Sequence, residues 1–134
     1  MRTILLCHQP DPIVTSAQSF DIHFDWLIET IPELYPDSRT IATWRVEQRP
    51  DRLIAGYGLQ AEAIAPHRSF YLDLLAPRQL SNGRGLVYPI ARGRVMRHEK
   101  KAEQLLLDLS WLGEGIQQLA ISPDGRVQCL RVIF

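Results

Sequence analysis

The stretch Phe20-Asp-Ile-His-Phe-Asp-Trp-Leu-Ile-Glu29 decides the fold expected for this chain. Apolar residues occupy every second position of it, namely Phe20, Ile22, Phe24, Trp26 and Ile28. Such alternation predicts a β-strand with one buried face. His23 and Asp25, two positions apart, then point the same way from the opposite face. An imidazole beside a carboxylate on a rigid strand indicates a site for a divalent transition metal; the alternative is a solvent-facing strand whose polar residues alternate.

The composition is typical of a single globular domain. The chain has 134 residues, of which 46% are hydrophobic and 22% are charged, so we expect one domain spanning residues 1–134 with its own core. No apolar run is long enough to span a bilayer, and the apolar part of the N-terminus is too short for a signal peptide. We therefore expect a cytoplasmic protein without a membrane partner. Cys7 and Cys129 are expected to be buried thiols, with a disulfide as the alternative.

The charges are balanced overall but unevenly distributed. A formal net charge of zero excludes a global field that would attract nucleic acid. Within residues 1–38 all charged side chains except Arg2 are acidic, whereas within residues 78–101 all except Glu99 are basic. This asymmetry is compatible with a basic rim beside a cation-attracting pocket, and equally with two solvated surfaces.

Short apolar and β-branched runs predict an all-β protein. We expect about eight short strands, little flanking helix and a compact antiparallel β-barrel. The expected strands cover residues 3–7, 20–29, 40–46, 69–75, 86–90, 93–97, 116–121 and 127–134. Turns or loops are expected at 13–19, 31–38, 48–51 and 81–85, where prolines, glycines or small polar residues gather.

Two segments are less regular in their pattern. Gly56 and Gly58 disfavour a helix, so we expect irregular or short extended structure over residues 52–65. Residues 100–112 show strand-like alternation at their C-terminal end but good helix propensity at Lys101-Ala-Glu-Gln-Leu105. The Pro123-Asp-Gly125 turn predicts a C-terminal hairpin, which makes a strand the more natural neighbour.

Four motifs in order resemble a known family. They are Ile22-His-Phe-Asp-Trp-Leu-Ile-Glu29, Thr43-Trp-Arg-Val46, His67-Arg-Ser-Phe-Tyr-Leu-Asp73 and Asn82-Gly-Arg-Gly85. Together they resemble the 3′-phosphoesterase domain at the N-terminus of bacterial DNA ligase D, and still more the short stand-alone relatives of that domain. The resemblance extends from His8 to the final hairpin. It implies a compact β-barrel with flanking helices, in agreement with the strand pattern.

The resemblance also implies an activity and a metal. Members of the family are Mn²⁺-dependent hydrolases of DNA repair, which remove a 3′-phosphate or a terminal ribonucleotide from DNA or RNA 3′ ends. The 3′-OH that remains is used by a repair polymerase or ligase. The family's ligands, two histidines and an aspartate, correspond to His8, His23 and Asp25; such a set also accepts other divalent transition metals. The phosphate-contacting histidine and a nearby tyrosine of the family, the candidate catalytic residues, correspond to His67 and Tyr71.

The chain departs from the family pattern in three places. An insertion around residues 10–19 separates the first two histidines, Leu27 stands where the family has an arginine, and Leu59 lies near the place of a second one. Losing two arginines removes charge that would hold phosphate oxygens. Arg45, Arg84 or the basic run from Arg92 are the candidates to replace that charge.

These departures motivate an alternative function. A catalytically degenerate relative would keep the barrel and bind a nucleic-acid end or a protein partner without turnover. The other distinctive residues have simple structural interpretations: His98 is expected at the surface, and Trp26, Trp44 and Trp111 are expected to fill the core.

Overall fold

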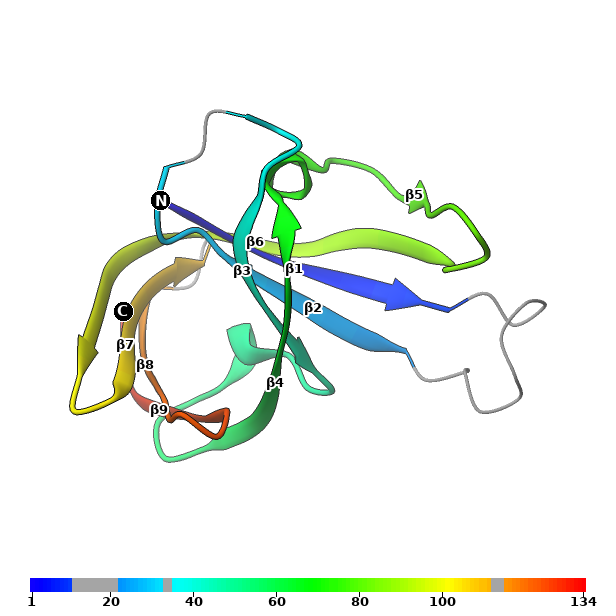
Figure 1. The fold of residues 1–134 in the computed structure, drawn as a ribbon. Helices are drawn as coiled ribbons and strands as arrows, with labels where there is room; N and C mark the ends of the chain where they lie inside the picture. Colours follow the sequence, from blue (N-terminus) through cyan, green and yellow to red (C-terminus); the bar gives the residue numbers. More distant parts are fainter. Residues whose placement is uncertain (11–21, 33–34, 112–114) are drawn as a thin grey trace.

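The computed structural model describes residues 1–10, 22–32, 35–111 and 115–134, which form one antiparallel sheet of nine strands. The strand order is β1-β2-β3-β4-β9-β8-β7-β6-β5, and an additional β1–β6 pairing closes eight of the strands into a ring (Figure 1). The expectation of a mainly β, closed antiparallel fold with little helix is thereby confirmed. Among the described residues, no helix is long and apolar enough to cross a membrane.

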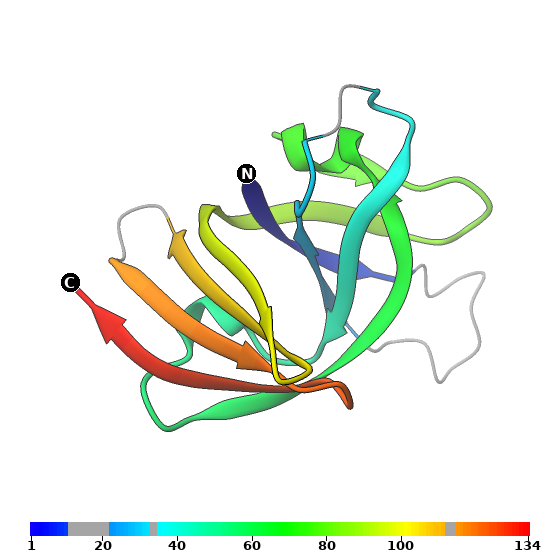
Figure 2. The same ribbon diagram turned by 60° about the vertical axis from the view of Figure 1, so that its left-hand side comes forward.

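The elements have the following bounds. The strands are β1 (Arg2–Gln9), β2 (His23–Ile28), β3 (Arg39–Val46), β4 (Gly58–Arg68), β5 (Arg78–Gln79), β6 (Leu86–Lys101), β7 (Gln104–Trp111), β8 (Ile116–Ile121) and β9 (Arg126–Ile133). Two short 3-10 helices are η2 (Pro50–Arg52) and η3 (Ser69–Asp73). Figures 1 and 2 show the ring from two sides, with β5 outside it. The expected loop at 13–19, and the insertion beyond Pro10, lie outside the described residues.

Both faces of β2 are buried, so the expectation of a strand with only one buried face was wrong. Trp26 and Ile28 point into the ring and join a core to which all eight of its strands contribute. Leu27 points the other way, into a second cluster to which β1, β3, β6 and η3 contribute. Cys7 and Cys129 are both buried and unpaired, which confirms the thiol interpretation.

The expected strand at 69–75 is instead the helical turn η3. Tyr71, Leu72 and Leu74 are buried there against the outer face of β1 and β2. Their spacing suits one helical turn, and a short apolar run does not distinguish a strand from a buried helical segment. The sheet thus gains a covering element on the side that carries His23 and Asp25.

Two glycines permit close backbone approaches within the sheet. Segment 52–65, expected to be irregular or short extended structure, is extended from Gly58 onward as β4, where a Cβ on Gly58 would approach the carbonyl of Val127 to 2.3 Å. The expected strand pair 86–90 and 93–97 is the single strand β6, because Gly93 permits close approach to the backbone of Ser110 rather than making a turn. By contrast, the described part of segment 100–112, residues 100–111, lies in the β6–β7 hairpin, which confirms the strand interpretation.

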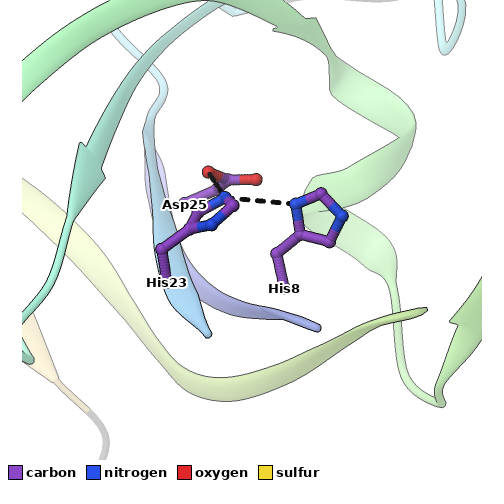
Figure 3. A group of neighbouring side chains, drawn as sticks. All are labelled: His8, His23 and Asp25. Carbon is purple, nitrogen blue, oxygen red and sulfur yellow. Dashed lines mark hydrogen bonds and ion pairs between the residues drawn. The ribbon is translucent and has the colours of Figure 1, made fainter. Parts of the chain in front are cut away.

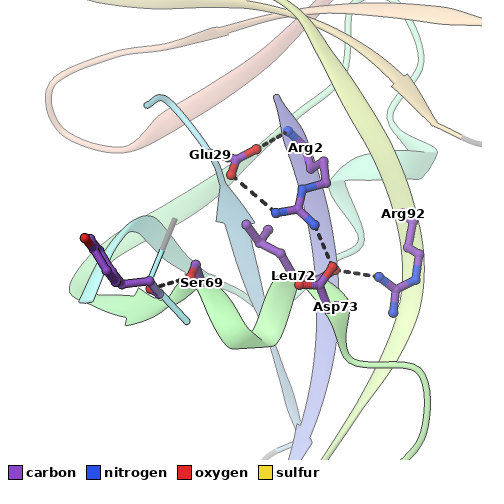
Figure 4. Close-up of polar contacts among 7 residues, drawn as sticks. Arg2, Glu29, Ser69, Leu72, Asp73 and Arg92 are labelled. Carbon is purple, nitrogen blue, oxygen red and sulfur yellow. Dashed lines mark hydrogen bonds and ion pairs between the residues drawn. The ribbon is translucent and has the colours of Figure 1, made fainter. Parts of the chain in front are cut away.

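Polar contacts tie η3 to the ring (Figure 4). Arg92 Nη1 donates to the carbonyl of Leu72 over 2.7 Å. The Arg2 guanidinium lies 2.6 Å from Asp73 Oδ1 and 3.5 Å from Oε2 of the buried Glu29. These contacts link β1, β6 and the end of β2 to the helix, so η3 is held in place beside the site described next.

Candidate metal centre

Antiparallel pairing of β1 and β2 brings three potential ligands together. The register places His8 directly opposite His23, although fifteen positions separate them in the chain. Asp25 follows two positions along β2 and therefore lies on the same face as His23. Figure 3 shows the three side chains converging at the ends of the two strands.

The spacing of the ligand atoms fits a single metal ion. His8 Nδ1 lies 3.1 Å from His23 Nε2, and His23 Nε2 lies 3.4 Å from Asp25 Oδ1. One ligand atom from each of the three residues can be chosen so that all lie within 4.8 Å of one another. Two atoms bound at about 2.1 Å to one ion are about 3.0 Å apart at a right angle and about 3.4 Å apart at the tetrahedral angle. The separations therefore suit neighbouring positions in one coordination shell.

A backbone carbonyl orients the first of these ligands. His8 Nε2 lies 2.6 Å from the carbonyl oxygen of Arg84. A carbonyl only accepts hydrogen bonds, so Nε2 must carry the hydrogen and donate it. In the neutral ring this leaves the lone pair on Nδ1, the atom that faces His23. Metal-binding histidines are commonly fixed by a hydrogen bond of this kind from the other ring nitrogen.

Asp25 supplies a buried carboxylate. The residue is only 5% exposed, and its Oδ1 has no hydrogen-bond partner among the described residues. Burial alone would raise the pKa of Asp25, but the imidazoles of His23 and His67 outweigh burial and hold this pKa well below its usual range. The carboxylate is therefore ionised at neutral pH. Its Oδ1 lies 3.4 Å from His23 Nε2 without a hydrogen bond, so a cation between these two atoms would be favourable.

His67 and Tyr71 lie on the other side of Asp25. His67 is the second-last residue of β4, and its Nε2 lies 3.8 Å from Asp25 Oδ2. Its Nδ1 lies 3.2 Å from the carbonyl of Ala65, which assigns the hydrogen of the neutral ring to Nδ1. The ring of Tyr71, on η3, meets the His67 ring edge-on with centroids 5.7 Å apart. The two candidate catalytic residues are therefore adjacent to the three candidate ligands.

A cavity of about 440 Å³ adjoins this cluster. The polar residues that line it are His8, Asp25, His67, Tyr71, Arg45 and Arg84. Arg45 is exposed, and its side chain makes no ion pair among the residues described. The guanidinium of Arg84 donates to Ser81 in its own turn. Two guanidinium groups beside a cation site make this cavity suitable for an anion such as phosphate.

The two positions at which the family has arginines are both buried, so their side chains cannot contact a ligand in the cavity. Leu27 is completely buried beneath η3, and Leu59 is buried inside the ring. Of the three candidate replacements, Arg45 and Arg84 line the cavity, whereas Arg92 supports η3 through its contact with Leu72. Charge at the site therefore comes from β3 and from the turn before β6.

Two features of the site were not expected from the sequence. The carbonyl of Arg84 orients His8, and the only sequence signal for it is the glycine-bearing turn at 81–85. Trp44 was expected in the core; it packs against the core but is only partly buried, and it lines cavities next to the site. His98 is exposed on β6, as expected.

Comparisons with known proteins give no independent identification of the site. A scan against protein-family models found no match, and searches of curated proteins and of solved structures found no significant match. The function is therefore argued from the geometry of the site and from the sequence motifs.

Proposed function

We propose that the protein is a metal-dependent phosphoesterase that acts on nucleic-acid 3′ ends, removing a 3′-phosphate or a terminal 3′-ribonucleotide. The observation that carries the proposal is the buried Asp25 oxygen without a hydrogen-bond partner, next to two imidazole nitrogens at metal-shell spacing. The imidazoles of His23 and His67 offset part of the cost of burying this carboxylate, and a cation between the three candidate ligands would offset it further.

His8 Nδ1, His23 Nε2 and the Asp25 carboxylate would hold the metal. Two imidazoles and one carboxylate suit Mn²⁺, the ion that the family resemblance implies, and also other divalent transition metals. When bound, the ion would polarise a phosphoryl oxygen and lower the pKa of a bound water. The Arg84 carbonyl would keep His8 in the ligating tautomer, since it accepts the hydrogen of Nε2.

The rest of the cavity would bind and protonate the substrate. Arg45 and Arg84 would attract the phosphate and pair with its oxygens. His67 lies beside Asp25, and its Nδ1–H donates to the Ala65 carbonyl. In its protonated form it would also carry a hydrogen on Nε2, with which it would bind a phosphate oxygen or donate a proton to it. Tyr71 packs edge-on against His67 and would keep that ring oriented toward the cavity.

The nucleic-acid part of the proposal rests on the four sequence motifs. Each of the histidines and the aspartate that the ligase D phosphoesterase family uses has a counterpart here, and those counterparts lie within one cluster. A repair polymerase or ligase would use the 3′-OH that the reaction leaves.

One observation favours a second candidate, a catalytically degenerate domain that binds a nucleic-acid end or a protein partner without turnover. Leu27 and Leu59 replace family arginines and are both buried away from the cavity. Such a protein would bind the metal and the 3′ end but release no phosphate. Binding of a nucleic-acid end should then weaken steeply with salt, because phosphate contacts release counterions.

The experiment is phosphate release from 3′-phosphorylated DNA and RNA oligonucleotides, with Mn²⁺ and after its removal by a chelator. Asp25→Ala should abolish metal-dependent release, while Asp37→Ala, which changes an exposed carboxylate, should retain it. Undiminished release by Asp25→Ala would refute the proposed site. Metal and oligonucleotide binding without release by the wild type would favour the second candidate.

A further inference from the structure

A second cavity, of about 700 Å³, adjoins the candidate metal centre and shares His23 and Arg45 with it. It lies between β3, β4 and the turn from β8 to β9. A group esterified to a phosphate in the first cavity would therefore have a second, larger space directly beside it. The volume is ample for a nucleoside.

The wall of this cavity includes an aromatic surface. One side of Trp44 packs against the core inside the ring, and the residue also lines this cavity and a neighbouring one of about 600 Å³. Trp26 and Trp111 are buried, at 0% and 3% exposure, so Trp44 is the tryptophan available to a ligand. An indole at the rim of a polar cavity is a platform on which a nucleobase stacks.

The charges of the cavity indicate which part of a substrate it accepts. Glu47, Glu62 and Asp124 line it against the single cation Arg45. Glu62 makes no ion pair or side-chain hydrogen bond among the described residues, so its carboxylate is available to hydroxyl or amino donors. Three carboxylates repel further phosphates, which argues against a path for the polyanionic strand. They are compatible with an uncharged group that carries several hydrogen-bond donors.

We infer that this cavity binds the terminal nucleoside of the phosphoester, with the base on Trp44 and the sugar hydroxyls toward Glu62 and the amide of Gln60. This inference depends on the proposed function in one respect, namely that the phosphate joined to the nucleoside lies in the first cavity. The base would then contribute to substrate selection. A phosphoesterase without this subsite would bind a phosphomonoester that has no base as tightly as a nucleotide.

The test compares the phosphonate analogue of adenosine 3′-monophosphate, whose C–P bond is not hydrolysed, with the phosphonate analogue of glycerol phosphate, which has no base, by calorimetry on Mn²⁺-loaded protein. The nucleotide analogue should bind about tenfold more tightly, since stacking of one base contributes on the order of 1–3 kcal/mol. Trp44→Leu should abolish this preference, and Trp44→Phe should retain part of it. Tyr57→Ala, which removes an exposed aromatic ring elsewhere, should leave it unchanged.

A second measurement separates failure of the subsite from failure of the metal centre. Adenosine alone should quench Trp44 fluorescence both in the wild type and in Asp25→Asn, because the subsite does not need the metal. Quenching without Mn²⁺ binding would support the subsite and refute the proposed function. No quenching in either protein, or a preference for the nucleotide that survives Trp44→Leu, would overturn the inference.

Discussion

The turn before β6 offers a sharp test of the candidate metal centre. Asn82, Gly83 and Gly85 adopt left-handed backbone conformations, with φ of 59°, 68° and 94°, and between them the Arg84 carbonyl reaches His8 Nε2 at 2.6 Å. Gly85→Ala places a Cβ on a residue with strongly positive φ, which costs about 1–2 kcal/mol if the conformation is kept. The turn is expected to relieve this strain by moving the carbonyl away from His8.

Loss of that hydrogen bond should weaken metal binding. A partner that fixes the orientation of a ligating histidine is typically worth about 10–100-fold in metal affinity, so Gly85→Ala should raise the Mn²⁺ Kd by that factor. Gly56→Ala is the matched control: Gly56 has φ of 88° and open space around its Cβ position, far from the cluster. Urea unfolding should show a similar loss of stability in both variants, and calorimetry should show weaker Mn²⁺ binding only in Gly85→Ala. Equal, wild-type affinity in both would refute the role of the Arg84 carbonyl.

Two further predictions concern the carboxylate and the histidine beside it. His67→Asn should bind Mn²⁺ like the wild type but release phosphate about 10²–10⁴-fold more slowly, as expected for loss of a proton donor. His98→Asn, which changes an exposed histidine, is the control. An unchanged rate of phosphate release in His67→Asn would contradict the role assigned to His67. The folded-state pKa of Asp25 lies below its unfolded value, so its ionised form stabilises the metal-free fold above about pH 4 and this contribution is lost as the pH falls further. The free energies of unfolding of the wild type and Asp25→Asn, measured with urea, should therefore approach each other as the pH falls. A difference in unfolding free energy that stays constant between about pH 6 and about pH 3 would show that the carboxylate contributes no such stability.

The ligand cluster could be predicted because its elements follow simple periodic rules. Alternation along Phe24 to Ile28 identifies a strand, and two-residue spacing places His23 and Asp25 on one face. His8 ends the preceding strand, and antiparallel neighbours bring the end of one strand beside the start of the next. These rules alone predict the His23 and Asp25 pair. His8 was added as a candidate ligand through the resemblance to the phosphoesterase family, and the strand pairing places it beside His23.

Other features depend on tertiary contacts that the sequence does not display. Gly58 was read as evidence against a helix and Gly93 as the start of a separate strand, but each allows two backbones to approach closely within the sheet. The helical turn η3 forms where its apolar side chains cover the outer face of β2, which is why Leu27 is buried rather than exposed. The role of the Arg84 carbonyl was equally hidden, since a backbone atom carries no residue-type signal.

The central claim is that His8, His23 and Asp25 bind one divalent metal ion. Calorimetric titration of metal-stripped protein with Mn²⁺ tests it most directly, with the wild type beside the nearly isosteric Asp25→Asn. Near-UV circular dichroism verifies that both proteins are folded. We predict stoichiometric binding by the wild type that is lost in Asp25→Asn. Absence of binding in the folded wild type, or equal binding by both proteins, would contradict the account.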